Sequence, residues 1–198
     1  MRSLEVGKSM FAPGAAIVGV LGILGSVSGC QSGPVTESSP YFDAPPGSTL
    51  EMLESVEIPA NSWHVDFQGG QVSEANNVAL YRPFCKLHIE SVASGPQTVS
   101  PQLIQITGMS HHQRIPAAAF ASVNRGIQIA SLQVTLGGGR DMDYITEIKL
   151  GGKTSPAVNQ LTCHNVDDAL TGTYLTLAQI NDVLGSYARI QVAGSGAG

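Results

Sequence analysis

Short runs of alternating apolar and polar residues constrain the fold of this chain more than any other feature of its sequence. Residues 63–68 read Trp-His-Val-Asp-Phe-Gln, and residues 85–90 read Cys-Lys-Leu-His-Ile-Glu. Because successive side chains of a strand point to opposite faces, each run predicts a strand with one buried and one polar face. We expect five further strands, at residues 103–107, 127–136, 144–150, 161–163 and 187–192.

Glycine-rich turns separate the expected strands. They are Gly69-Gly70, Ser94-Gly95-Pro96, Gly137-Gly138-Gly139 and Gly151-Gly152. Seven short strands without alternating helices are typical of antiparallel sheets rather than of doubly wound parallel ones. The sequence therefore predicts a mainly β domain, either an antiparallel β-sandwich or a barrel-like sheet, with one short C-terminal helix.

That helix is expected at residues 177–184. Thr176 can cap its first turn, and Gly185 can take the left-handed conformation that ends it. Its apolar residues fall on one face, so we expect it to pack over an end or an edge of the sheet. Residues 116–123 form either a second helix or a loop, because their alanines favour a helix but the segment is short.

The composition fits a single globular domain at residues 50–192. The chain has 198 residues, of which 42% are hydrophobic and 13% are charged, and a domain of this size can bury a sizeable core. The formal net charge is −5. Nucleic acid is not an expected partner, because there is no basic cluster to neutralise phosphates and no aromatic ladder to stack bases.

Two segments outside this domain are rich in Pro, Ser and Gly. Ten of the 20 residues at 30–49 are Pro, Gly or Ser, and residues 193–198 read Ala-Gly-Ser-Gly-Ala-Gly. Such segments bury too little apolar surface to offset the entropy of ordering. We predict a flexible tether at 30–49 and a disordered tail at 193–198.

Residues 1–29 have the parts of a secretory signal peptide. Arg2 and Lys8 outweigh Glu5 at the start, and residues 11–29 carry no ionisable side chain. Small residues precede Cys30, where we expect cleavage. The same 19 uncharged residues could instead span a bilayer about 30 Å thick as an uncleaved anchor, although five glycines and Pro13 lower their apolarity.

Val27-Ser28-Gly29-Cys30 resembles the lipobox of bacterial lipoproteins, in which an aliphatic residue and two small residues precede an invariant cysteine. The resemblance implies a diacylglycerol on the Cys30 sulfur and, in many bacteria, an acyl chain on the new amino group. The acylated Cys30 would then hold the protein on a lipid bilayer. Gln31, rather than Asp, follows the cysteine, and in Gram-negative lipoproteins this implies the periplasmic face of the outer membrane.

Lipidation of Cys30 would leave Cys85 and Cys163 as a pair. An exported chain with three cysteines otherwise keeps an odd thiol. We predict a disulfide between Cys85 and Cys163, since the periplasm is oxidising; the alternative is two buried free thiols. Closing a loop of roughly 80 residues stabilises the fold by at most about 4 to 5 kcal/mol.

The five histidines are the main candidates for a metal site. They are His64, His88, His111, His112 and His164. His64 and His88 lie on the polar faces of two expected strands and would meet if those strands pair, with His111-His112 nearby in a loop. Zinc needs three or four convergent ligands, and histidines on a polar face are ordinarily solvated, so we predict no metal site.

Two further motifs resemble metal sites only in part. Met109 and Met142 lie near His111 and Asp143, but thioethers in separate segments are ordinarily hydrophobic side chains. Asp141-Met142-Asp143 lacks the repeated acidic spacing and the closing Glu of a calcium loop. We interpret it as a hairpin turn with a solvated rim.

No motif predicts a reaction. The chain contains no Gly-x-Ser-x-Gly and no phosphate-binding loop. Sugar cleavage would need two convergent carboxyl groups, for which the candidates are Glu51, Glu54, Glu57, Asp66 and Glu90. We therefore predict no catalytic residue and no cofactor.

The expected function is that of a binding or assembly module of an envelope complex, whose partner would be another envelope protein. A sheet edge offers a surface for strand addition. The alternative is an envelope enzyme that acts on the cell wall or on glycan.

Overall fold

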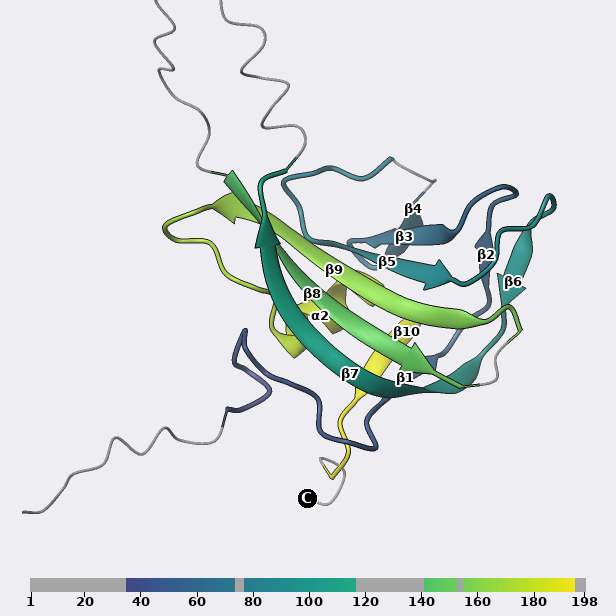
Figure 1. The fold of residues 1–198 in the computed structure, drawn as a ribbon, viewed down its shortest axis with the longest axis horizontal. Coiled ribbons are helices and arrows are strands. Elements are labelled where there is room, and N and C mark those ends of the chain that lie inside the picture. The colour runs from purple at the N-terminus through teal and green to yellow at the C-terminus, as the bar shows by residue number, and fades with distance from the viewer. Residues whose placement is uncertain (1–34, 74–76, 117–140, 153–154, 195–198) are drawn as a thin grey trace, which may run out of the picture. The chain divides into compact units, whose positions relative to one another are not determined.

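An antiparallel sheet of eight strands forms most of the domain (Figure 1). The computed structural model describes residues 35–73, 77–116, 141–152 and 155–194. Its elements are β1 (Thr49–Met52), β2 (Val56–Ile58), β3 (His64–Gln68), β4 (Gln71–Ser73), β5 (Phe84–Ile89), β6 (Gln97–Val99), β7 (Gln102–Arg114), β8 (Asp141–Gly151), β9 (Val158–Asp168), α2 (Leu177–Leu184) and β10 (Ala188–Gln191).

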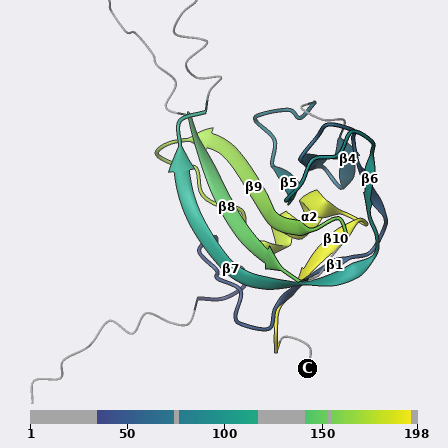
Figure 2. The same cartoon turned by 45° about the vertical axis from the view of Figure 1, so that its right-hand side comes forward.

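The strands of the large sheet follow the order β10-β1-β7-β8-β9-β5-β3-β4, and every neighbouring pair is antiparallel. β2 and β6 pair separately. The sheet curls into a half-barrel, and α2 lies on the inner side of the curve (Figures 1 and 2). The prediction of a mainly β, antiparallel, barrel-like domain with one short C-terminal helix is confirmed.

Alternate residues of the strands face α2 and form the core. Val65 and Phe67 of β3 lie opposite Leu87 and Cys85 of β5, and all four side chains are buried in the core. We call this side of the sheet the inner face, and the side that points away from α2 the outer face. The side chains next to these core residues in the sequence, such as His64 and Asp66, therefore point to the outer face.

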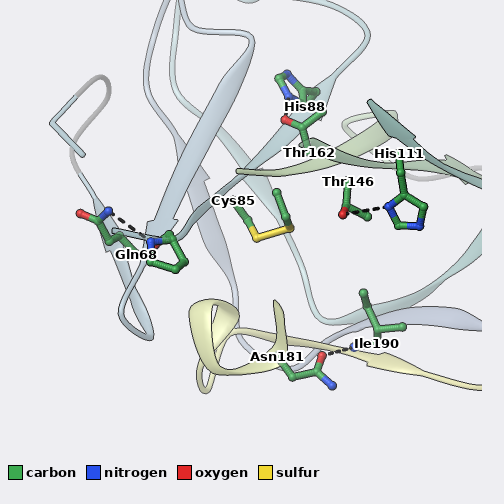
Figure 3. Close-up of a disulfide and its surroundings, with 10 residues drawn as sticks. Gln68, Cys85, His88, His111, Thr146, Thr162, Asn181 and Ile190 are labelled. Carbon is green, nitrogen blue, oxygen red and sulfur yellow. Dashed lines mark hydrogen bonds between the residues drawn. A yellow bond between two sulfur atoms is a disulfide. The ribbon is translucent and has the colours of Figure 1, made fainter. Parts of the chain in front are cut away.

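Helix α2 connects the two ends of the curled sheet. At its C-terminus, the Gly70 N–H of the β3–β4 turn donates to the Val183 carbonyl at 3.1 Å. The Asn181 side chain accepts from the Ile190 N–H of edge strand β10 at 2.8 Å (Figure 3). One short helix thus fixes the separation of both edges, and it covers part of the β10 edge that would otherwise be open to strand addition.

Glycine is required where the helix and the hairpin meet. Gly69 and Gly70 have φ of 60° and 76° and form the two-residue turn of the β3–β4 hairpin, a geometry that L side chains rarely adopt. Gly185, with φ of 59°, ends α2, and a Cβ on it would lie 2.5 Å from the Gly70 Cα. Thr176 caps the other end in a capping box with Gln179, as the sequence predicts.

Several sequence predictions need amendment. Strands β1, β2, β4 and β6 were not anticipated, because segments of three or four residues are too short to show a period. The strand expected at 127–136 lies outside the described residues, as does the segment 116–123 beyond its first residue.

Part of the segment predicted as a tether packs on the domain. Phe42 and Ala44 lie against the core. Ser48 is buried, and its side chain accepts from the Ala193 N–H at 3.1 Å. The prediction of a flexible tether rests on the Pro, Ser and Gly content of residues 30–49, which gives too little weight to these few apolar side chains. No helix among the described residues is long and apolar enough to cross a bilayer.

Candidate functional site

Two of the five histidines come together on the outer face. β3 pairs with β5 in a register that places His64 directly opposite His88, with ring centroids 5.8 Å apart. The expectation that they meet if their strands pair is confirmed. They are not solvated, however, since only 7% of His64 and 5% of His88 is exposed.

Trp63 lies over this pair. Its ring centroid is 4.7 Å from that of His88 and 5.1 Å from that of His64. The alternation predicts Trp63 on the buried face with Val65, but β3 begins at His64, so Trp63 precedes the strand and 54% of it is exposed. The cluster therefore presents one large aromatic ring to solvent above two buried imidazoles.

A buried ion pair completes the outer-face cluster. Asp66 is fully buried and lies opposite Lys86 in the β3–β5 register. The Lys86 Nζ donates to Asp66 Oδ1 at 3.0 Å, and His64 Nε2 lies 3.4 Å from the same oxygen. A buried carboxylate needs such partners because desolvation of an unpaired charge is costly.

Both imidazoles are uncharged at neutral pH. Burial, followed by His64 and Lys86, lowers the pKa of His88 to about 4. Burial and Lys86 also lower the pKa of His64, although Asp66 opposes the shift. His88 Nε2 lies within hydrogen-bonding distance of Thr162 Oγ1, at 2.8 Å (Figure 3), and the Nδ1 atoms of both rings are buried without a hydrogen bond to any described residue.

His164 belongs to a second buried cluster on the same face. Its Nδ1 lies 3.0 and 3.1 Å from the two carboxylate oxygens of Asp143, and Arg114 Nε donates to the same carboxylate at 2.9 Å. Phe84 stacks on the imidazole with ring centroids 4.6 Å apart. Burial alone would raise the pKa of Asp143, but the hydrogen bonds and charges of His164 and Arg114 lower it below its usual value.

The interpretation of Asp141-Met142-Asp143 as a solvated turn is therefore wrong. These residues begin β8, and Asp143 is buried. Arg114 and His164 come from the two strands that flank β8. Sequence alone could not place these partners around Asp143, because strand order is needed to do so.

The remaining histidines do not join either cluster. His111 and His112 are both in β7 rather than in a loop, and they point to opposite faces. His112 is exposed. His111 faces inward, with Nδ1 3.2 Å from Thr146 Oγ1 (Figure 3) and Nε2 3.5 Å from Asp43 Oδ1.

Across the described residues, no three His, Cys, Asp or Glu side chains are placed to share a metal ion. His64 and Asp66 are close to each other, but the positive charge beside the Asp66 carboxylate is that of Lys86. Met109 packs against the core, as expected of a hydrophobic side chain.

The acidic residues that were candidates for sugar cleavage occupy different environments, and Asp66 is buried beside Lys86. Glu51 accepts hydrogen bonds from Arg189 and Gln191 on β10, whereas Glu54, Glu57 and Glu90 are exposed on separate segments. A hollow of about 250 Å³ in the described surface contains none of them. It is lined by Gly69, Arg82, Pro83, Gln179, Asp182 and Val183.

Cys85 and Cys163 form a disulfide on the inner face, between neighbouring strands β5 and β9 (Figure 3). Both residues are fully buried in the core. The predicted pairing is thus present in the structure, whereas Cys30 lies outside the described residues. Because it is buried in the core, the disulfide joins two strands of the fold and is not part of an exposed site.

Comparison with protein-family models, with curated proteins and with solved structures found no match for this chain. Its function must therefore be inferred from its own residues. Five residues of the two clusters were not candidates from the sequence, because they give no signal until the strands are paired: Trp63, Phe84, Lys86, Arg114 and Thr162.

Proposed function

We propose that the chain is a bacterial lipoprotein, held on the periplasmic face of the outer membrane through acylated Cys30, whose β domain binds a component of an envelope complex. The support for the address is Val27-Ser28-Gly29-Cys30 after an uncharged apolar segment, followed by Gln31. Two or three acyl chains would be needed for lasting attachment, because one chain binds a membrane only marginally.

One observation carries binding rather than catalysis. The buried acids of the outer face are engaged, Asp66 with Lys86 and Asp143 with His164 and Arg114, while the large exposed apolar group of the two clusters is the Trp63 ring. General acid–base catalysis needs a titratable group within reach of a substrate. An aromatic ring fixed by packing supplies contact area at low entropic cost, as in many binding surfaces.

An envelope enzyme that acts on the cell wall or on glycan is less well supported. Two hollows in the described surface contain, of the histidines and acids named as candidates, only His111. No pair of these groups converges at either hollow.

The address is tested with the Cys30→Ser variant. We expect loss of processing and loss of membrane association, because serine offers no thiol for acylation. Ser32→Ala, two residues away, is the matched control and should be processed normally. A Cys30→Ser protein that is still cleaved and stays in the membrane fraction would overturn the lipoprotein assignment.

The binding face is tested with a photo-crosslinking amino acid at position 63, in cells that express the full-length chain. Position 103 is the control, because Leu103 is also an exposed apolar residue. We expect a reproducible adduct of one size from position 63 and none from position 103. Leu103 lies on the same face as Trp63 but on β7, four strands away from β3, so equal labelling from both positions, or none from either, would remove the Trp63 cluster as the binding surface.

A further inference from the structure

A segment that we call the strap, residues 36–47, lies against the inner face just before β1. It is the dark-blue chain that leads into β1 in Figure 1. Phe42 packs against the core, Tyr41 meets Tyr174 edge-on with ring centroids 5.5 Å apart, and the Asp43 carboxylate lies 3.5 Å from His111 Nε2. With Ala44, which also packs against the core, the strap thus contacts the domain through four consecutive side chains.

The strap is held by these side chains and not by its backbone. Its hydrogen bonds with described residues stay within residues 36–48, such as Phe42 N–H to the Ser39 carbonyl at 3.2 Å. The first backbone bond to the sheet is at Ser48, whose carbonyl accepts from the Ile106 N–H at 2.9 Å. A segment attached in this way can leave without breaking a strand pairing.

The surface under the strap has the composition of a small binding site. Its lining outside the strap is Met109, His111, Thr146, Leu175, Leu177 and Ile180, contributed by β7, β8 and the region of α2. With Ser39 and Phe42 of the strap in place, the unfilled space is only about 10 Å³. Phe42 and its neighbours therefore fill an apolar site with two polar groups at its side, a usual arrangement for a ligand pocket.

We propose that this is a peptide-binding site and that the strap is its internal occupant. The partner is an extended peptide with an aromatic residue followed by an acidic one, because Phe42 and Asp43 show which side chains the site accepts. The aromatic group takes the place of Phe42, and the acid takes the place of Asp43 beside His111. This inference deepens the proposed binding function and rests on it for its biological setting.

The strap regulates such a site by competition. A segment joined covalently to its site has an effective concentration of millimolar order, so a free peptide binds weakly while the strap is seated. The apparent affinity falls in proportion to the fraction of molecules in which the site is open. Because the strap is the stretch between Cys30 and the domain, its release would also lengthen the connection to the membrane.

The test is a fluorescence anisotropy titration of the purified full-length chain with a labelled peptide of residues 36–47. We expect weak binding to the wild type and binding at least about tenfold tighter to Phe42→Ala, since that variant loses the main contact of its own strap. A control peptide with Ala in place of its Phe should bind neither protein. Circular dichroism and the intact disulfide show whether the variant is folded.

Asp43→Asn provides a second variant that should not disturb folding, because 69% of the Asp43 side chain is exposed. It weakens the strap less, so we expect peptide binding to tighten by about two- to fivefold. No gain in either folded variant, or equal binding of the Phe and Ala peptides, would overturn the proposal. A wild-type dimer that dissociates on addition of the peptide would also overturn it, by assigning the site to the strap of a second copy.

The titration needs no membrane and no acylation. A negative titration would therefore overturn the peptide site but would not affect the lipoprotein assignment. A negative Cys30→Ser experiment would overturn the lipoprotein assignment but would not affect the peptide site.

Discussion

The cluster around His64 and His88 and the cluster around Asp143 and His164 lie on the same face of one sheet. In the first, the two imidazoles face each other under Trp63 and are uncharged at neutral pH. In the second, an imidazole points at a carboxylate that also accepts from Arg114. In the first cluster Lys86 is the closer partner of the carboxylate beside His64, whereas in the second the imidazole is itself a close partner of the carboxylate.

The difference shows that the polar groups packed against a buried histidine decide what it does, whether they lie directly opposite it or, like Asp143 beside His164, diagonally across the strands. His88 lies opposite His64 and within hydrogen-bonding distance of a threonine hydroxyl, and burial outweighs the attraction of Asp66 for its proton. His164 has a carboxylate at hydrogen-bonding distance. Acidification should therefore disturb the two clusters in different ranges of pH.

Loss of Asp66 should have the largest effect on stability. In Asp66→Asn, Lys86 loses its buried countercharge, and we expect the free energy of unfolding to fall by about 3 kcal/mol. Urea denaturation at pH 7 measures the change. Glu90→Gln removes an exposed acid just after β5 and should change stability by less than about 0.5 kcal/mol; a similar loss in both variants would mean that net charge, not the ion pair, is responsible.

Asp143→Asn should destabilise the second cluster by about 2 kcal/mol at pH 7, because hydrogen bonds to a charged, buried acceptor are lost. The folded-state pKa of Asp143 is lowered from 3.8, so the stability it contributes is present above that pH and is lost as pH falls through the folded value. The difference between wild type and variant should therefore narrow as the solution is acidified below this point. A difference that stays constant at the lowest pH at which the protein folds would show that the carboxylate charge is not what stabilises the cluster.

The sequence predicts the elements better than it predicts the clusters. The alternation at 63–68 and 85–90 predicts β3 and β5, and the Thr176 cap predicts α2, because these signals are local. The same alternation predicts a solvated face for His64 and Asp66, which are buried. A period of two distinguishes the faces of a strand but does not say whether one face or both are covered.

The sequence could not predict contacts between distant strands outright. It gave each such contact either with a stated alternative or on the condition that two strands pair. The disulfide joins residues 78 positions apart, and two buried thiols were the alternative. The His64–His88 contact depended on the pairing of β3 with β5. Neither the partners of Asp143 nor the packing of Phe42 has a sequence signal, since both depend on strand order and on the curl of the sheet.

The pH dependence of stability should distinguish the two clusters directly. The pKa of His88 is about 4 in the folded protein, against an ordinary value of 6.5, so only the unfolded chain takes up this proton between those values. Stability should therefore fall as pH drops from 6.5 to about 4, a range in which Asp143 stays ionised. The slope of the urea midpoint against pH should be shallower in His88→Phe.

His112→Phe is the matched control, because His112 is an exposed histidine of the same sheet. It should keep the wild-type slope. An unchanged slope in His88→Phe would assign the acid sensitivity to other groups, with His64 the next to test because its pKa is lowered as well.

The smallest effect on stability is expected from Trp63→Ala. Because 54% of Trp63 is exposed, the free energy of unfolding should fall by only about 1 to 2 kcal/mol. The ring nevertheless covers His88, and its removal admits water, which should raise the pKa of His88 from about 4 toward 6.5. An NMR titration of the His88 ring protons measures this shift, with Leu103→Ala as an exposed apolar control that should leave it unchanged. An unchanged pKa in Trp63→Ala would mean that the strands, and not the tryptophan, exclude water from the imidazole pair, and the ring would then serve chiefly as a surface contact for a partner.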